Sequence, residues 1–130
     1  MSTRGWPDSG SRPWPEIASS FQELADADPA FGPLAAIAES VITCRADEHL
    51  AATTSMHDLV VTAAPVPAET PVDVVIVRSP SSGLANPGWV LIEHCSTTGH
   101  DARIARPAGA AVPLFWRFML EKFGIGPARA

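Results

Sequence analysis

The spacing of apolar residues changes twice along the chain, and these changes constrain the fold more than any other feature. Up to about residue 50, apolar side chains recur every three or four positions, as on one face of a helix. From about Asp58 they alternate or run continuously, as in strands, and from Val112 the helical spacing returns. Helices and strands are therefore segregated along the sequence, which predicts an α+β fold rather than an α/β fold.

Two helices are predicted in the N-terminal part. The first should span 15–27, because a proline suits its first position and apolar residues follow at helical spacing. The second should open at Pro33, continue through Arg45 and extend as far as Leu50. Each helix carries one apolar stripe, so the two are expected to form an αα-hairpin.

Four strands are predicted to follow the helices, over 59–63, 72–77, 89–95 and 101–106. Their connectors are too short for parallel crossovers, so the strands should form an antiparallel meander. The loop Ser79–Gly88 is longer than most hairpin loops. We interpret it as a plain connector, with a recognition role as the alternative.

The last predicted element is an unusually apolar helix over 112–123 that packs on the sheet. Leu114 and Phe118 fall beside Arg117 on the side of the helical wheel away from the main apolar row. About four strands and two other helices offer too little surface to cover so many large apolar side chains. We therefore expect Leu114, Phe118 and Arg117 to form an interface with a protein partner or, in a homodimer, with a second copy.

The chain has the length and composition of one domain. It has 130 residues, of which 46% are hydrophobic and 18% charged. Residues 1–13 are rich in Ser, Gly and Pro without periodicity, so we expect a flexible tail there, a single domain over 14–125 and a short tail over 126–130. No apolar run is long enough to span a membrane, and no apolar segment opens the chain, so we expect a cytoplasmic protein.

Charge and cysteine content exclude further classes of function. The net charge is −5, and only the last thirty residues carry more basic than acidic groups. Binding to nucleic acid needs a concentrated basic surface, so it is not expected. The chain contains two cysteines, Cys44 and Cys95, and neither belongs to a CxxC motif. We expect both to be reduced thiols.

The densest polar cluster is Glu93–Asp101. It holds Cys95, His100 and Asp101, which could form the thiol, base and carboxylate of a small enzyme if the chain turns tightly between them. His94 is a poor partner for Cys95, because neighbouring residues of a strand point to opposite faces. The favoured interpretation is that Cys95 is a small core residue.

Metal and cofactor sites are not predicted. His57, His94 and His100 are weak candidates for metal ligands, but no HExxH motif or comparable spacing brings them together. The chain also lacks GxSxG, GxGxxG and GxxxxGK[ST] motifs. No cofactor is therefore expected.

Two classes of function remain. The first is a non-catalytic cytosolic binding or interaction protein, such as an inhibitor, an immunity factor or an adaptor. The second is a small enzyme or small-ligand-binding domain with a pocket near the turn after the third predicted strand, where Cys95, His100, His94 and His57 would lie. We favour the first class, because no convergent catalytic set is recognisable.

Overall fold

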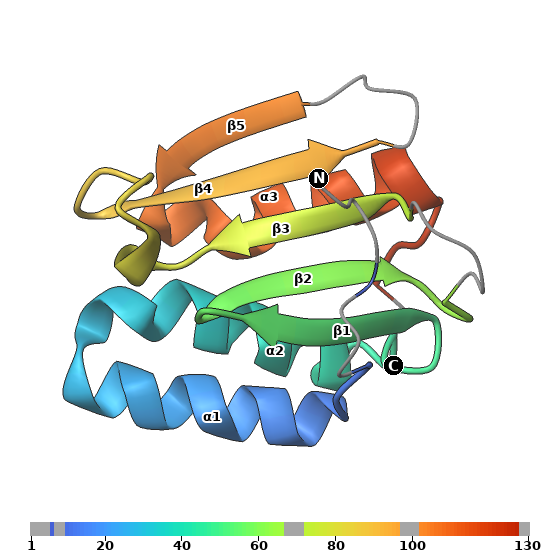
Figure 1. Ribbon diagram of the computed structural model, residues 1–130, viewed down its shortest axis with the longest axis horizontal. Helices are drawn as coiled ribbons and strands as arrows, with labels where there is room; N and C mark the ends of the chain where they lie inside the picture. Colours follow the sequence, from blue (N-terminus) through green and yellow to red (C-terminus); the bar gives the residue numbers. More distant parts are fainter. Residues whose placement is uncertain (1–5, 7–9, 67–71, 97–101, 128–130) are drawn as a thin grey trace.

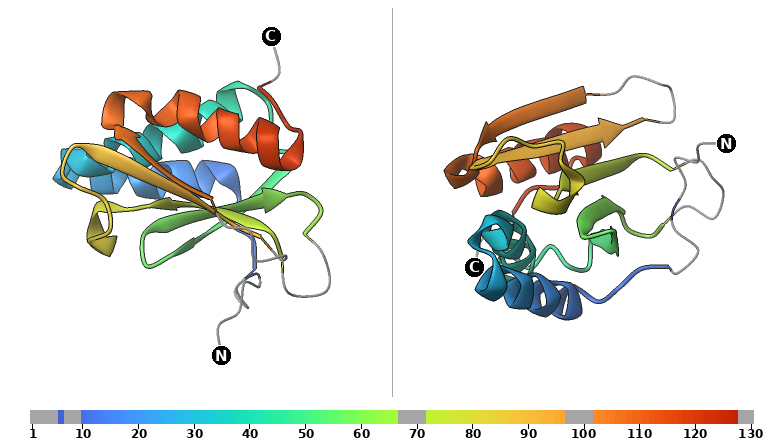
Figure 2. Two further views of the ribbon diagram at one scale, coloured as in Figure 1. Left: turned by 90° about the horizontal axis from the view of Figure 1, so that it is seen from above. Right: turned by 60° about the vertical axis from the view of Figure 1, so that its left-hand side comes forward.

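The computed structural model describes residue 6 and residues 10–66, 72–96 and 102–127. It confirms an α+β fold in which two helices precede an antiparallel sheet and a third helix follows it. The main elements are α1 (Trp14–Ala27), α2 (Gly32–Thr43), β1 (Leu50–Ser55), β2 (Asp58–Ala63), β3 (Val74–Arg78), β4 (Trp89–Cys95), β5 (Ala102–Pro107) and α3 (Ala111–Phe123). The strands form a meander in the order β1-β2-β3-β4-β5, and the helices lie on one face of it (Figures 1 and 2).

The sheet has five strands rather than four, because β1 forms over Leu50–Ser55, where no strand was expected. The second helix stops at Thr43, and Arg45 has a left-handed backbone with φ 57°. The chain then turns into β1, whose sequence LAATTS contains two alanines, a residue type that is depleted in strands. All six residues of β1 pair with β2, and this pairing sets the strand conformation. Local sequence preference alone does not predict such pairing.

The N-terminal helix is attached to the first edge of the sheet. Trp14 is buried in the first turn of α1, and its indole Nε1 donates a hydrogen bond to the carbonyl of Leu50 at 2.7 Å. Just before the helix, the backbone N–H of Arg12 donates to the carbonyl of Ala52 in β1 at 2.8 Å. The Arg12 guanidinium also donates to Thr54 at 2.7 Å. These bonds join the entry of α1 to β1.

The main core lies between the helices and the sheet. From α3 it receives Phe115 and Met119, which are fully buried, and from the sheet it receives alternate residues such as Val61 and Ile92. Leu114 and Phe118 are also buried here, with 6% and 3% exposure.

The expectation that Leu114 and Phe118 exceed the capacity of the core is therefore wrong. α3 packs against α2 as well as the sheet, so it is covered on two sides. The indole of Trp116 reaches α2, where its Nε1 donates to Ser40 Oγ at 3.2 Å. The exposed residues of α3 include Arg117 and Leu120.

The opposite face of the sheet, which we call the outer face, carries a smaller apolar cluster. Its buried members are Val60, Val72 and Val74. Trp6, Ile76 and Cys95 are partly buried and pack against them. None of the helices in the described parts of the chain has the length and apolar character needed to cross a membrane.

Candidate functional site

The predicted thiol site lies partly outside the described residues. His100 and Asp101 fall in a stretch that the structure does not describe. Cys95, at the end of β4, is half-buried and packs with the apolar cluster of the outer face. His94 is buried and faces the helices, with its ring centroid 6.5 Å from that of Phe123. His94 and Cys95 therefore belong to different faces of the sheet, and a Cys95–His100–Asp101 arrangement stays a prediction.

His57 lies far from this cluster, at the other end of the sheet. It occupies the turn between β1 and β2, where it has φ 72°. Its ring makes an edge-on contact with Phe31, with a centroid separation of 5.8 Å, and its Nδ1 lies 3.4 Å from Ser81 Oγ. Within residues 10–66, 72–96 and 102–127, His, Cys, Asp and Glu side chains form no group of three or more that could hold a metal ion.

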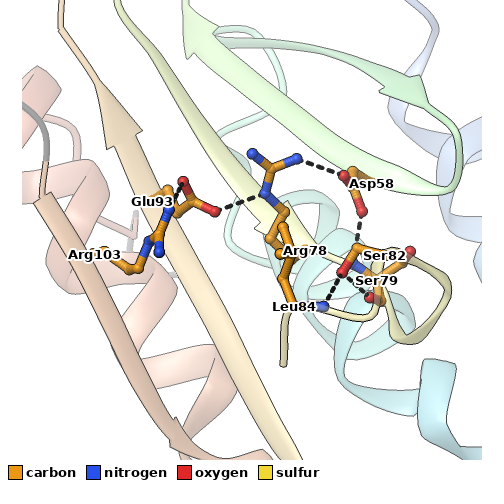
Figure 3. A network of polar contacts seen from close by, with 7 residues as sticks. All are labelled: Asp58, Arg78, Ser79, Ser82, Leu84, Glu93 and Arg103. Atoms are coloured by element: carbon orange, nitrogen blue, oxygen red, sulfur yellow. Dashed lines mark hydrogen bonds and ion pairs between the residues drawn. The ribbon is translucent and has the colours of Figure 1, made fainter. Parts of the chain in front are cut away.

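An ionic network crosses the outer face from β2 to β5 (Figure 3). At its centre, Arg78 donates from Nε to Glu93 Oε2 at 2.7 Å and from Nη1 to Asp58 Oδ2 at 2.8 Å. Arg103 Nη2 donates to Glu93 Oε1 at 3.3 Å. The second oxygen of Asp58 accepts from the backbone N–H of Ser79 at 2.7 Å.

The charges of the network stabilise one another. Burial alone would raise the pKa of Glu93, but the hydrogen bond and charge of Arg78, with a smaller contribution from Arg103, lower it below its ordinary value. Burial alone would lower the pKa of Arg78, but its hydrogen bonds to Glu93 and Asp58 raise it. Glu93 is therefore ionised at neutral pH, and both of its oxygens accept hydrogen bonds from arginines. A carboxylate held in this way is a poor general acid or base.

The network positions the loop between β3 and β4. Asp58 holds the first residue of this loop, Ser79, through its backbone N–H. Ser82 Oγ then donates to the carbonyl of Ser79 at 2.8 Å and accepts from the N–H of Leu84 at 3.1 Å. At the far end of the loop, the N–H of Trp89 donates to the carbonyl of Asn86 at 3.0 Å. Asp58 therefore secures a loop that begins 21 residues further along the chain.

The same loop forms one wall of an apolar groove with a volume of about 450 Å³. The opposite wall is the turn between α1 and α2, and the start of β4 and the chain after β5 complete it. Both the turn and the loop lie at the left-hand end of Figure 1. The lining includes four prolines, one amide and one indole: Pro29, Pro33, Pro80, Pro87, Asn86 and Trp89.

Local bonds shape both walls of the groove. Asp28 Oδ1 accepts the N–H of Ala30 at 3.0 Å, which forms a short turn of 3₁₀-helix between α1 and α2. On the other side, the N–H of Ala108 donates to the carbonyl of Gly88 at 2.8 Å and holds the end of β5 against the start of β4. Trp89 stays 46% exposed at the mouth of the groove. A recognition role for the loop Ser79–Gly88 was the alternative interpretation, but the turn between α1 and α2 was not expected to lie beside it. Prolines on both segments, and an aromatic residue just after the loop, were the visible signal.

Comparisons with protein-family models, with curated proteins and with solved structures found no match.

Proposed function

We propose that this protein is a non-catalytic binding protein that holds a short, uncharged, apolar segment of a partner protein in the groove beside Trp89. The observation that carries the proposal is the groove itself, which combines a volume of about 450 Å³ with an apolar lining. An exposed aromatic side chain beside a preformed apolar depression is typical of the residues that contribute most to binding between proteins.

The surface around the groove supports the proposal. Across the described residues, four large apolar side chains are exposed, and Met56, Leu84 and Trp89 all lie on turns or strand ends at the same end of the sheet. Met56 is 90% exposed and Leu84 is 54% exposed. Exposed apolar side chains at the end of the sheet that carries the groove can add to the apolar surface that a partner buries.

The chemistry of the lining favours binding over catalysis. None of the described residues that line the groove is charged, and none carries a thiol, imidazole or hydroxyl group. The polar side-chain groups are the amide of Asn86 and the indole N–H of Trp89, which can donate hydrogen bonds to a bound peptide. An uncharged lining fits an uncharged occupant, because a charged one would lose its hydration without a partner.

Panning of a phage-displayed library of random short peptides tests the proposal. The native protein and Trp89→Ala should be panned in parallel, and the enriched peptides should then be synthesised and titrated by calorimetry. We expect uncharged, apolar peptides whose affinity falls at least about tenfold in Trp89→Ala, as for a central aromatic residue of an interface. Leu120→Ala is the matched control, because Leu120 is 60% exposed and lies on α3.

Two outcomes would contradict the proposal. One is that the native protein enriches no peptide beyond those that Trp89→Ala enriches. The other is that enriched peptides bind Trp89→Ala and Leu120→Ala equally well. Circular dichroism should show that both variants fold, since both residues are exposed in the native protein.

An interface through α3, including a homodimer, stays a separate prediction. Of the three residues expected to form it, Arg117 is exposed, whereas Leu114 and Phe118 are buried in the core. A partner of this helix would therefore have to bind its exposed residues, such as Arg117 and Leu120.

A further inference from the structure

The two edge strands of the sheet differ in how they are covered. At the edge formed by β1, the backbone N–H of Arg12 donates to the carbonyl of Ala52. At the other edge, β5 pairs with β4 and with no other described strand. Figure 1 shows β5 at the margin of the sheet, with no drawn helix or strand beyond it.

The register shows which backbone groups of β5 point outward. The bond from Ala108 N–H to the carbonyl of Gly88 marks a hydrogen-bonded pair, and the pairing continues from Trp89 with Pro107 to Val90 with Arg106. In an antiparallel pair, hydrogen-bonded and non-hydrogen-bonded positions alternate. The backbone groups of Arg106 therefore face β4, as do those of residues 102 and 104. The N–H groups of Arg103 and Ala105 face away from the sheet and can donate to an added strand.

One outward carbonyl already has a donor from the chain itself. Arg106 Nη1 donates to the carbonyl of Ala105 at 2.8 Å. Both residues are exposed, so this bond lies at the surface. The guanidinium therefore occupies the position that the N–H of a neighbouring strand would take.

The positive charge of β5 favours an acidic partner strand. β5 carries Arg103 and Arg106 and no acidic residue, and the Arg103 side chain is 65% exposed. Charged side chains on an edge strand oppose pairing with a strand of like charge and admit one of opposite charge. A second copy of β5 would add two more cations, so a homodimer through this edge is disfavoured.

We propose that the edge of β5 binds an extended, acidic segment of a partner protein, which adds to the sheet as a sixth strand. The segment's carbonyls accept from the outward N–H groups of Arg103 and Ala105, and its carboxylates pair with the guanidinium groups of Arg103 and Arg106. Arg106 exchanges its bond to Ala105 for a bond to a carboxylate, and the Ala105 carbonyl then accepts an N–H from the added strand. This surface is distinct from the groove beside Trp89, and the proposal does not depend on the function assigned to the groove.

Arg103 and Arg106 point to opposite faces of the sheet, because they lie three residues apart on one strand. Suitable probes are therefore peptides that repeat two valines and two glutamates, which place carboxylates on both faces of an added strand. The matched controls are peptides that repeat two valines and two lysines, and a valine–glutamate peptide with proline at alternate positions, which cannot form the strand ladder. We expect only the unbroken acidic peptide to bind the native protein, with an affinity that falls as salt is raised. Amide hydrogen exchange should show protection of Arg103 and Ala105 upon binding.

Variants separate the parts of the proposal. Arg106→Glu keeps the Arg103–Glu93 pair and should weaken binding of the acidic peptide at least about tenfold, because it replaces an attraction by a repulsion. Arg117→Glu is the control, because Arg117 is exposed on α3. Trp89→Ala should bind the acidic peptide like the native protein, which separates this edge from the groove.

The proposal is overturned if the native protein does not bind the acidic peptide, or if Arg106→Glu and Arg117→Glu bind it equally. It is also overturned if the peptide binds without protecting the amides of Arg103 and Ala105. Should Arg106→Glu fail to fold, Arg106→Gln takes its place, with the same expected direction and a smaller loss.

Discussion

Arg78 Nε lies 2.7 Å from Glu93 Oε2, although the two residues are not directly opposite each other in the sheet. Glu93 is opposite Ile76 on the neighbouring strand, so the contact is diagonal and requires the long side chain of an arginine. The same guanidinium reaches Asp58 on the other side. One cation thus joins β2, β3 and β4 on the outer face.

Removal of the Arg78 charge should destabilise the protein strongly. Arg78→Met would leave the carboxylates of Asp58 and Glu93, whose side chains are 10% and 9% exposed, without their main cation. Breaking such a pair by removal of one partner costs about 3 kcal/mol at a partly buried site. The free energy of unfolding in urea measures this loss.

Arg103→Ala is the matched control for this prediction. Its side chain is 65% exposed and its bond to Glu93 is longer, at 3.3 Å. We expect a loss below about 1 kcal/mol, as for other exposed ion pairs. Equal losses in the two variants would contradict the assignment of Arg78 as the centre of the network.

Acid should weaken the fold in part through Glu93. Its pKa is lower in the folded chain than its ordinary value of 4.5, which we take for the unfolded chain. Its contribution to stability is therefore complete above that value and is lost as the pH falls through the lower, folded-state pKa. Urea unfolding of the native protein and Glu93→Gln between neutral and acidic pH should show a shallower pH dependence in the variant. The same dependence in both proteins would show that another group is responsible.

Two residues of α3, Phe118 and Leu120, should contribute very differently to the stability of the fold, because one is buried and the other exposed. Phe118→Ala should lower the free energy of unfolding by about 3–5 kcal/mol, because Phe118 is 3% exposed and its removal leaves a cavity. Leu120→Ala should change it by less than about 0.5 kcal/mol, because Leu120 is 60% exposed. Thermal or urea unfolding compares them. A small effect of Phe118→Ala would mean that α3 is not a core element.

The two cysteines should remain thiols in protein purified without reductant. Cys44 packs against the main core and Cys95 against the apolar cluster of the outer face, so the sheet separates them. No disulfide geometry can bridge that separation without moving the backbone. Mass spectrometry after denaturation and alkylation should show two modified thiols. A Cys44–Cys95 bridge in native protein would contradict the packing of β4.

The turn between β1 and β2 offers a stabilising change. Met56 and His57 form a two-residue turn with φ 51° and 72°, closed by the pairing of Ser55 with Asp58. Such turns favour Asn followed by Gly, because other side chains are strained at positive φ. His57→Gly should therefore raise the free energy of unfolding by about 1 kcal/mol, because the left-handed conformation costs a non-glycine residue about 1–2 kcal/mol and the greater freedom of glycine in the unfolded chain offsets part of the gain. The loss of the ring contact with Phe31 opposes this gain, and a net destabilisation would show that the contact outweighs the strain.

The sequence predicted those parts of the fold that strong local patterns specify. The helices near Trp14 and Ala111 begin within one residue of their expected starts, and the antiparallel order of the strands followed from short connectors. β1 was missed because Ala51 and Ala52 favour a helix and only pairing with β2 makes them a strand. Leu114 and Phe118 were assigned to the surface because a helical wheel does not show that a second helix covers that side.

The candidate site was harder to predict, because it is formed between segments that are distant in sequence. Pro29 and Pro87 line opposite walls of the groove, and Arg78 joins Asp58 to Glu93, so that the three residues come from three strands. Alternation along β3 implies that Arg78 shares a face with Ile76, but it does not show which side chains of the neighbouring strands Arg78 contacts. A register must be known before such contacts can be derived.

The order of the strands has a consequence for how the chain reaches its native state. Every pair of neighbours in the sheet is also a pair of neighbours in the sequence, so each pairing closes only a short loop and loses little chain entropy. During synthesis, β1 to β4 can therefore pair as soon as they emerge. Phe115 and Met119 of α3, the helix that contacts β4 and β5, are made after all five strands. α1 and α2 can cover their part of the helix-facing side earlier, but the apolar residues of that face that α3 covers stay exposed until α3 is made, which makes the nascent chain more prone to aggregate than the folded protein.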